Sequence, residues 1–227
     1  MRPATKRVVS SSSETDTASR MLLRCHHVPK GDLHGVRPVL EAAFREYGLP
    51  HAMRSDSGPP FASKAIAGLS RMSVWMVRLG IWPERIEPGH PEQNGSHERM
   101  HKTLQEEVAV NPAANLRLQQ RDLDRFRAEY NHERPHEAIA QRVPADLYVP
   151  SPRLFPDRLP EIEYPAEASV RTVKDCGDVK HLGDRYFLSE VLAGERVALW
   201  EAEHGWDVYF GVIRLGTLDP RTRRVKP

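Results

Sequence analysis

The apolar pattern of this chain changes period along its length, and that change constrains the fold more than any other feature. Between residues 21 and 130, short apolar stretches alternate with longer segments whose apolar residues recur every three or four positions. Such alternation predicts strands and helices packed as an α/β layer. Beyond residue 165, apolar and polar residues alternate in short runs that glycines separate. This second pattern predicts a small all-β barrel or sandwich.

Helix stop signals and prolines divide the α/β part into elements. Gly48 and Gly80 each follow a helical pattern and are expected to end it. In a later helix, Met100, Leu104 and Val108 are spaced by four and form the apolar side. The expected elements are strands over residues 21–28, 50–55 and 85–87, and helices over residues 35–47, 63–79, 92–108 and 116–130.

Shifts in composition mark the expected domain boundaries. Residues 1–19 contain a run of serines and no apolar periodicity, so we expect a disordered leader. Residues 151–165 are rich in proline and are expected to form an extended linker. Residues 20–150 then form the expected α/β domain, and residues 166–227 form the expected barrel, which is SH3-like in size.

Composition argues against several classes of protein. Of the 227 residues, 39% are hydrophobic and 28% are charged, which is ordinary for a globular protein with a buried core. The formal net charge of +2 is compatible with a nucleic-acid partner but does not argue for one. Cys25 and Cys176 are the only cysteines and lie far apart, so a disulfide framework or a zinc ribbon is not expected. With no apolar run of ~18–20 residues and no signal peptide, we expect a cytoplasmic protein without a membrane partner.

Two carboxylates occupy positions suited to metal chemistry. Asp56 follows a predicted strand at a glycine-proline turn, and Glu98 lies near the start of a predicted helix after a polar loop. Acids on adjoining elements can hold divalent metal between them, as metal-dependent phosphoryl transfer requires. Each residue also has a plainer interpretation, because aspartate commonly caps such turns and glutamate is common on solvated helix faces. If they share metal, their carboxyl groups should lie within ~4–8 Å of each other.

Three motifs, taken in order, resemble the integrase core of bacterial insertion-sequence transposases and retroviral-type integrases. The first is Asp56-Ser57-Gly58 followed by Phe61. The second is the run from His90 to Gly95 followed by Glu98. The third comprises residues 130–136 (Tyr-Asn-His-Glu-Arg-Pro-His) and residues 144–148 (Pro-Ala-Asp-Leu-Tyr). The resemblance covers about residues 15 to 150.

The resemblance implies an RNase H-like fold with a triad of two aspartates and a glutamate. In that family the triad binds two Mg²⁺ or Mn²⁺ ions for DNA cleavage and strand transfer, and the active protein is a homo-oligomer. Asp56 would match the second acid and Glu98 the third, both as catalytic metal ligands. The DNA contacts carried over to this chain are Asn94, Arg99, Lys102 and Arg134.

This sequence departs from the family pattern at its beginning. The first acid of the triad lies upstream of the segment that matches residues 15–20, and the only aspartates before Asp56 are Asp16 and Asp32, which align elsewhere. The helix-turn-helix domain that usually precedes the core is also missing. We therefore expect an N-terminally incomplete core with impaired strand transfer, since losing one major electrostatic contributor typically costs ~10²–10³-fold. The alternative is a catalytically inactive DNA-binding remnant of a mobile element. As a DNA-binding protein of the bacterial cytoplasm, the chain is expected to associate with the nucleoid.

A zinc-protease motif overlaps the same helix. Residues 97–101 read His-Glu-Arg-Met-His, in which two histidines on one helix face could bind zinc. Arg99 within the motif and Lys102 after it are poorly suited to a helix buried beneath a zinc site. We prefer the integrase interpretation and expect His97 to point towards the core, about 100° around the helix from Glu98.

The C-terminal barrel leaves two roles open. A structural or oligomerisation module is one, and the family resemblance supports DNA contact as the other. The basic tail can serve as a phosphate-binding end or as a solvated surface. Its charged residues are Arg221, Arg223, Arg224 and Lys226.

Overall fold

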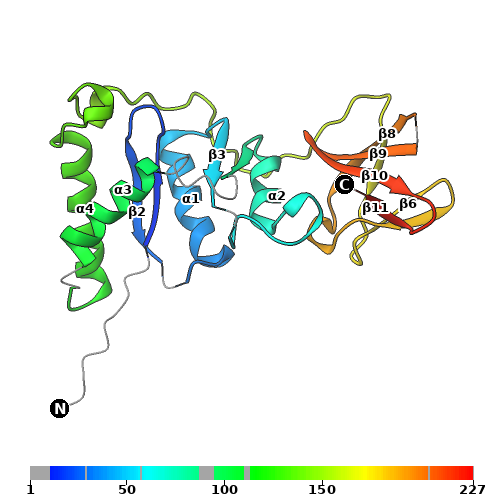
Figure 1. Cartoon of the computed structure of the whole chain (residues 1–227), viewed down its shortest axis with the longest axis horizontal. Coiled ribbons are helices and arrows are strands. Elements are labelled where there is room, and N and C mark those ends of the chain that lie inside the picture. The colour runs from blue at the N-terminus through cyan, green and yellow to red at the C-terminus, as the bar shows by residue number, and fades with distance from the viewer. Residues whose placement is uncertain are drawn as a thin grey trace, which may run out of the picture. The chain divides into compact units, whose positions relative to one another are not determined.

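The computed structural model describes residues 11–28, 30–56, 58–86, 95–109, 113–203 and 205–226. The chain forms two compact units. The first unit combines Met1–Leu49 with Ile86–Phe155, and the second combines Pro50–Arg85 with Pro156–Pro227. Helices dominate the first unit, and a large β-sheet dominates the second (Figure 1).

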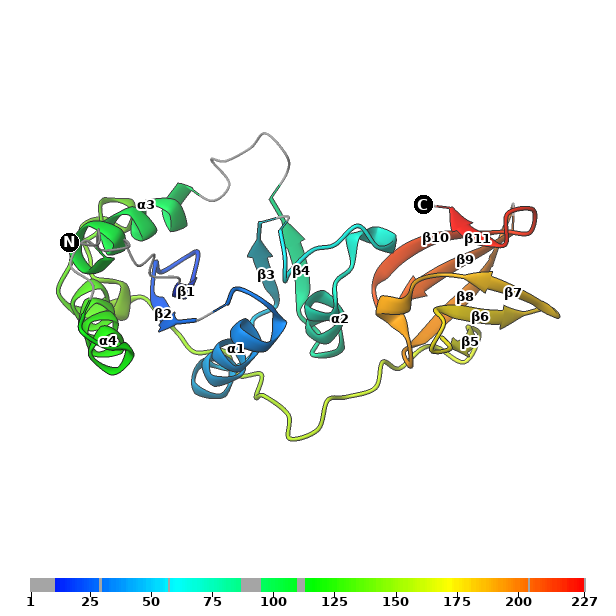
Figure 2. The same cartoon turned by 90° about the horizontal axis from the view of Figure 1, so that it is seen from below.

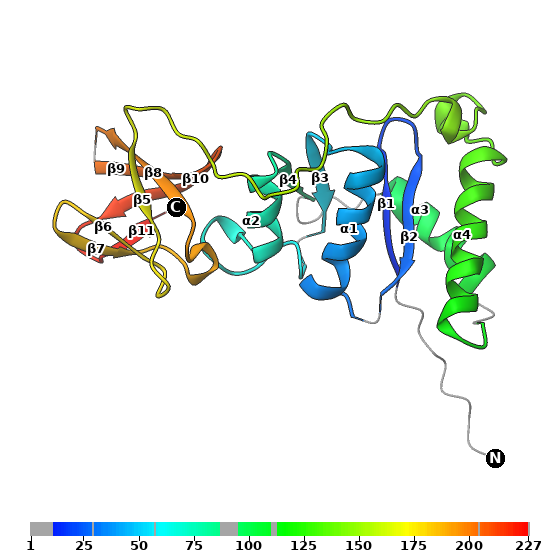
Figure 3. The same cartoon turned by 180° about the vertical axis from the view of Figure 1, so that it is seen from behind.

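The first unit is built on a β-hairpin flanked by helices. The hairpin lies between α1 on one side and α4 on the other (Figures 1 and 3). Its elements are β1 (Ser11–Thr15), β2 (Leu22–His27), α1 (Leu33–Tyr47), α3 (Gly95–Leu104), the π-helical segment η3 (Gln105–Ala109) and α4 (Leu116–His132). The strand and three helices expected from the apolar pattern in this region are confirmed as β2, α1, α3 and α4.

Strand β1 corrects the expectation that residues 1–19 form a disordered leader. It pairs antiparallel with β2, with Ser13 opposite Cys25 and Glu14 opposite Arg24. No apolar periodicity marks this strand, because β1 is made of serine, threonine and glutamate. Its stability comes instead from backbone pairing and from hydroxyl groups bonded to histidines of α3. Residues 1–10 lie outside the described ranges.

A small apolar core joins β2 to α3 and α4. Leu22 and Cys25 of the strand are buried among apolar side chains of the two helices. The predicted apolar side of α3 is confirmed by this burial. On the other side of the hairpin, the Arg24 guanidinium donates to the Ala42 carbonyl at 3.0 Å and ties β2 to α1. The helix residues of the core are Met100, Leu104, Val108, Leu123, Phe126 and Tyr130.

Polar side chains of α4 satisfy the backbone along the outer edge of β2. The Asn131 amide accepts from the Leu22 N–H at 2.8 Å and donates to the Leu22 carbonyl at 3.0 Å. The Gln120 amide accepts from the His27 N–H at 3.1 Å and donates to the Cys25 carbonyl at 3.0 Å. An uncovered strand edge would pair with other chains. Here α4 closes that edge with side chains, so no further strand is needed beside β2.

The α/β part of the second unit contains a parallel strand pair and a short helix. Its elements are β3 (Ala52–Ser55), the 3₁₀ turn η1 (Ile66–Gly68), α2 (Arg71–Arg78) and β4 (Trp82–Arg85), and β3 pairs with β4. The helix expected over residues 63–79 is shorter, because Ala67 and Gly68 adopt positive φ and Ser70 then caps α2. The strand expected over residues 85–87 begins earlier, at Trp82, and Glu87 lies outside the described ranges.

Seven strands form the sheet of the second unit in the order β5-β8-β9-β10-β11-β7-β6 (Figure 2). The sheet curls until β5 and β6 approach each other, where the Arg171 side chain donates to the Lys180 carbonyl at 3.1 Å. The expected small barrel is therefore confirmed. The alternating runs that begin at residues 169, 184, 195, 206 and 212 correspond to β5, β7, β8, β9 and β10, whereas β6 and β11 have no such run. The strands are β5 (Ser169–Thr172), β6 (Asp178–His181), β7 (Asp184–Phe187), β8 (Arg196–Ala202), β9 (Gly205–Phe210), β10 (Ile213–Asp219) and β11 (Arg224–Lys226).

The core of the barrel extends to α2. Leu69, Val74 and Val77 share one apolar cluster with barrel residues such as Phe210. This shared core explains why residues 50–85 group with the barrel, whereas the sequence placed them with the α/β domain over residues 20–150. The described part of the chain has no helix with the length and apolar character needed to cross a membrane.

The segment expected to be an extended linker, residues 151–165, has no helix or strand but is hydrogen-bonded at both ends. In the first unit, the Ser151 N–H donates to the Tyr47 carbonyl at 2.8 Å. In the second unit, the Tyr164 hydroxyl donates to the Arg196 carbonyl at 2.8 Å. Gly48 is required beside the first contact, because it adopts φ +80° and a Cβ there would lie 2.3 Å from the Ser151 carbonyl oxygen.

Substituting Asn131 should loosen β2 selectively. We expect Asn131→Ala to destabilise the first unit by roughly 2 kcal/mol, because the N–H and carbonyl of Leu22 would lose their partner in a buried site. Hydrogen–deuterium exchange of peptides covering residues 22–27 is the measurement, with the neighbouring exposed His132→Ala as the matched control. Unchanged protection of β2 in Asn131→Ala would contradict the role assigned to this amide. Tryptophan fluorescence measures the unfolding of the second unit separately, because that unit contains Trp75, Trp82, Trp200 and Trp206.

Candidate metal and nucleic-acid site

Asp56 directly follows the last residue of β3, as the sequence predicts. Its side chain is exposed, and its Oδ1 atom accepts from the Gly58 N–H at 3.2 Å. Within the described residues, no lysine or arginine pairs with this carboxylate. Asp56 therefore supports a turn and also keeps most of its acceptor capacity available.

Glu98 lies in the first turn of α3, which confirms its predicted position. The side chain is exposed, and in the part of the chain that the structure describes it forms neither a hydrogen bond nor an ion pair. A carboxylate near a helix N-terminus is electrostatically favourable, because the first N–H groups point towards it. Asp56 belongs to the second unit and Glu98 to the first, and the distance between their carboxyl groups stays a prediction.

The two aspartates upstream of Asp56 have local structural roles. The Asp16 Oδ2 atom accepts from the N–H and the hydroxyl of Ser19, each at 2.7 Å. Asp32 caps α1 by accepting from the Gly35 N–H at 2.9 Å. Over the described ranges, no group of three histidine, cysteine or carboxylate side chains is close enough to hold a metal ion. Asp56 and Glu98 thus remain the candidate pair.

His97 and His101 face β1 rather than solvent. The His101 Nε2 atom lies 2.8 Å from the Ser13 hydroxyl, and the His97 Nδ1 atom lies 3.3 Å from the Thr15 hydroxyl. The rings meet edge to face with centroids 4.7 Å apart. Burial lowers the pKa of His97 to about 4 and also lowers the pKa of His101. This confirms that His97 points inward, and the hydroxyl contacts favour a role in attaching α3 over a zinc site.

The basic residues expected to contact DNA differ in their surroundings. Lys102 is 77% exposed and lies 4.0 Å from Glu106, so its ammonium group is free to reach a ligand. The Arg99 side chain is exposed, and its Nε atom makes a long 3.4 Å contact to the Gly95 carbonyl. Arg134 instead pairs with Glu107, with N–O distances of 2.8 and 2.9 Å. Asn94 lies outside the described residues.

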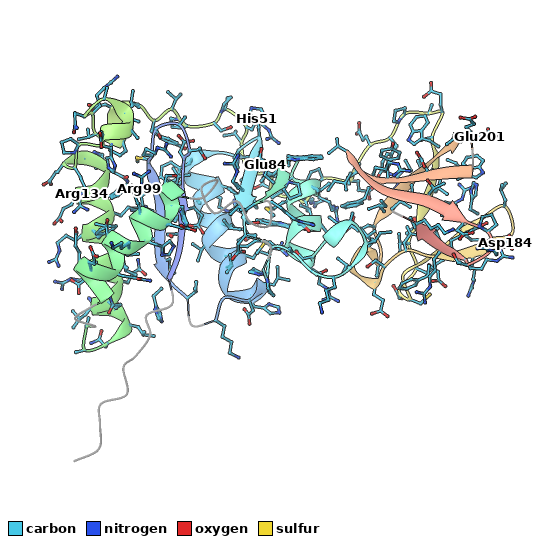
Figure 4. The ribbon with its side chains drawn as sticks, in the orientation of Figure 1. His51, Glu84, Arg99, Arg134, Asp184 and Glu201 are labelled. Carbon is cyan, nitrogen blue, oxygen red and sulfur yellow. The ribbon has the colours of Figure 1, made fainter. Side chains whose placement is uncertain are left out.

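Tyr130 lies near a second group of positively charged side chains, which the sequence did not predict. Its ring is buried, with the His136 ring 4.5 Å away. Burial raises the pKa of Tyr130, and the charges of Arg20, Arg134 and Arg99 act in the opposite direction. Arg99 comes from α3 and Arg134 from the turn after α4, both in the first unit (Figure 4). Arg20 was not expected in a site, because only its backbone conformation distinguishes it.

The basic tail of the barrel is largely engaged within its own unit. Arg223 pairs with Asp184, and Lys226 pairs with Asp219 at 2.7 Å. Hydrogen bonding to Lys226 holds the pKa of Asp219 well below its usual range. The Arg224 guanidinium lies 5.9 Å from the centre of the Phe187 ring. These contacts favour a structural role for Arg223 and Lys226 over phosphate binding.

Comparisons with known proteins support the resemblance to integrases. Residues 79–144 match the family described as "Integrase core domain". The "Insertion element IS407 uncharacterized 31.7 kDa protein" of Burkholderia multivorans is 29% identical over 113 residues, which cover 49% of this chain and 39% of that protein. The "Insertion element IS476 uncharacterized 39.2 kDa protein" of Xanthomonas euvesicatoria is 34% identical over 107 residues, which cover 47% of this chain and 29% of that protein. The chain therefore spans less than half the length of either relative.

A solved structure is similar in fold. It is the cryo-EM structure of the simian T-cell lymphotropic virus intasome in complex with PP2A regulatory subunit B56 gamma. The matching chain has a TM-score of 0.50 and 16% identity, over 94% of this chain and 78% of that chain. The likeness confirms the expected fold class, an RNase H-like integrase core with a β-barrel. The matched family segment contains Glu98, Arg99, Lys102 and Arg134 and begins after Asp56.

The attachment of α3 to β1 should weaken in acid. The folded state keeps His97 and His101 neutral, whereas the unfolded chain protonates them below the ordinary pKa of 6.5. Their contribution to stability is therefore complete above about pH 6.5 and is lost as the pH falls towards about 4. The loss should reach roughly 2 kcal/mol. Hydrogen exchange of α3, corrected for the intrinsic pH dependence of exchange and measured in metal-free buffer, is the test.

Two variants separate this effect from general acid sensitivity. His97→Gln keeps a polar side chain but cannot titrate, so it should flatten the pH dependence of exchange in α3. His132→Gln, at an exposed position of α4, should retain the original pH dependence. An identical pH profile in wild type and His97→Gln would contradict the assignment.

Proposed function

We propose that this chain carries part of a catalytic core for metal-dependent cleavage and strand transfer of DNA, as in the transposition of a bacterial insertion element, with activity impaired because only two of the three triad carboxylates are matched. The observation that carries the proposal is the placement of Glu98. It lies in the segment that matches the integrase core domain, at the start of α3, with an exposed carboxylate that has no partner among the described residues. Asp56, at the end of β3, supplies the second carboxylate.

The donor set fits Mg²⁺ or Mn²⁺. Both ions prefer oxygen ligands, and Mg²⁺ is commonly held by one or two carboxylates together with substrate phosphates. Neither Asp56 nor Glu98 is neutralised by a cation within the described residues, so both can act as anionic ligands. A bound ion would polarise a phosphate oxygen and stabilise the negative charge that develops during displacement.

The remaining residues of α3 would position the DNA. Arg99 and Lys102 project from the exposed part of the same helix as Glu98 and would bind phosphates beside the reacting group. Arg134 would contribute when a phosphate competes with Glu107 for its guanidinium. Asn94, just before α3, is retained as a DNA contact. His97 and His101 act indirectly, because they hold α3 against β1.

The proposed assembly is a homo-oligomer on DNA. An intasome is an integrase assembly, and the chain of similar fold comes from such a structure. The barrel would serve this assembly through protein or DNA contacts, chiefly at residues other than Arg223 and Lys226, which are paired internally.

A second candidate is DNA binding without strand transfer. The observation in its favour is the use of Asp16 and Asp32 for local hydrogen bonds, which leaves two carboxylates where the family uses three. DNA contacts through arginine and lysine do not depend on the metal ligands, so binding survives when catalysis does not.

A strand-transfer assay with the element's own DNA ends tests these alternatives. For the chain as it stands, we expect product below detection with Mg²⁺ or Mn²⁺, because two carboxylates do not fix both ions required for in-line displacement. DNA binding should be measurable by fluorescence anisotropy and should weaken steeply with salt. Glu98→Gln should bind DNA at least as well as wild type, since it removes a negative charge.

The outcomes are distinct. Product that disappears in Asp56→Asn, but not in the control Asp122→Asn, a half-buried carboxylate that pairs with Arg125, would show that the two carboxylates suffice or that another residue completes the site. Absence of any DNA binding by the wild-type chain would contradict the proposed function in both its forms.

A further inference from the structure

Arg20 occupies a backbone position that favours glycine. It lies in the turn between β1 and β2 with φ 66°, in the left-handed region where a side chain is unfavourable. The turn is closed by hydrogen bonds from the Asp16 N–H to the Met21 carbonyl, at 2.8 Å, and from the Arg20 N–H to the Asp16 carbonyl, at 2.9 Å. Backbone strain of this kind is retained where a side chain is needed in a particular place.

The surrounding contacts hold Arg20 beside α4. Leu22, two residues further on, is fixed at both its N–H and its carbonyl by Asn131. Asn131 is adjacent to Tyr130, which places the turn next to the buried tyrosine. The Arg20 Nε atom is buried and has no acceptor in the described structure. The protein encloses this Nε atom, so the terminal N–H groups of the guanidinium, which make no hydrogen bond among the described residues, are the ones that can meet an anionic ligand.

The Arg134 guanidinium lies 5.7 Å from the centre of the Phe126 ring, which packs against Tyr130 with ring centroids 5.7 Å apart. Arg99 comes from α3 and Arg134 from the turn after α4, and both carry charge that acts on the Tyr130 hydroxyl together with that of Arg20. Glu107 neutralises Arg134. No carboxylate among the described residues pairs with Arg20 or Arg99, and the nearby Asp16 carboxylate is already bonded to Ser19. The cluster therefore keeps an excess of positive charge.

We propose that Arg20, Arg99 and Arg134 form a phosphate-binding site for the DNA backbone, with Arg20 as its fixed member. Guanidinium groups suit this ligand because their planar N–H donors match phosphate oxygens in pairs. The three arginines belong to the first unit, and Arg99 follows Glu98 on α3, so the site would extend phosphate binding from Glu98 towards the turn between β1 and β2. The inference rests on the proposed DNA function and adds a residue that positions the substrate.

The test compares Arg20→Gly with wild type in the intact chain. Glycine suits φ 66°, so Arg20→Gly should melt at the same temperature as wild type or higher. Its affinity for a fluorescein-labelled DNA duplex should nevertheless fall about five- to tenfold. Because one phosphate contact is lost, the slope of log K against log salt should become shallower by about 0.9.

The matched control for the loss of one positive charge is Arg117→Ala. Alanine is used at this position because glycine would weaken helix α4. Arg117 is exposed in the first turn of α4, roughly 20 Å along that helix from Tyr130. This variant should change affinity less than twofold and leave the salt slope unchanged. Arg20→Lys should restore part of the affinity, since it keeps the charge without the planar donors.

The failures are distinguishable. If wild type binds DNA and Arg20→Gly binds with the same affinity and salt slope, the phosphate site is wrong and the proposed function stands. If Arg20→Gly loses affinity only as it loses thermal stability, Arg20 has a structural role and the site is equally wrong. If wild type binds no DNA at any salt concentration, the proposed function itself fails.

Discussion

The hydrogen bonds between α4 and the edge of β2 are the constraint on which the rest of the first unit depends. Asn131 and Gln120 replace the neighbouring strand that an exposed β-edge would otherwise recruit. With β2 fixed in this way, β1 is aligned by backbone pairing, and its Ser13 and Thr15 hydroxyls meet the histidines of α3. The position of Glu98 follows from these contacts, because it lies on the same helix but outside its buried side.

On the short helix α3, the side chains that pack against the rest of the first unit are different from the side chain proposed to bind metal. Met100 and Leu104 supply apolar packing, and His97 and His101 supply polar contacts to β1. Glu98 remains unpaired within the described residues. Leaving an anionic group without a partner forgoes stabilising interactions, which is expected where charge must be available to a ligand. The same logic applies to Arg20, whose backbone strain and unsatisfied Nε atom have no evident structural benefit.

Periodicity predicted the parts of the fold that are stabilised by apolar burial. Helices α1, α3 and α4 were predictable because their buried residues recur at helical spacing, and Asp56 and Glu98 were placed correctly at a strand end and a helix start. Strand β1 was not predictable, because it is polar and depends on histidines more than 80 positions away. Local pattern also could not show that residues 50–85 share a core with the barrel, or that Glu107 neutralises Arg134. The role of Arg20 depends on a backbone dihedral that its residue type does not reveal.

We propose that Asp56 and Glu98 are ligands of the same metal ion, and a double-mutant cycle on Mn²⁺ binding tests this proposal. Binding to the intact chain would be followed by electron paramagnetic resonance for wild type, Asp56→Asn, Glu98→Gln and the double variant. Ligands of one ion are coupled, so each single variant should lose most of the affinity and the double variant should lose little more. Independent, additive losses, or a single variant that binds Mn²⁺ like wild type, would contradict the shared site.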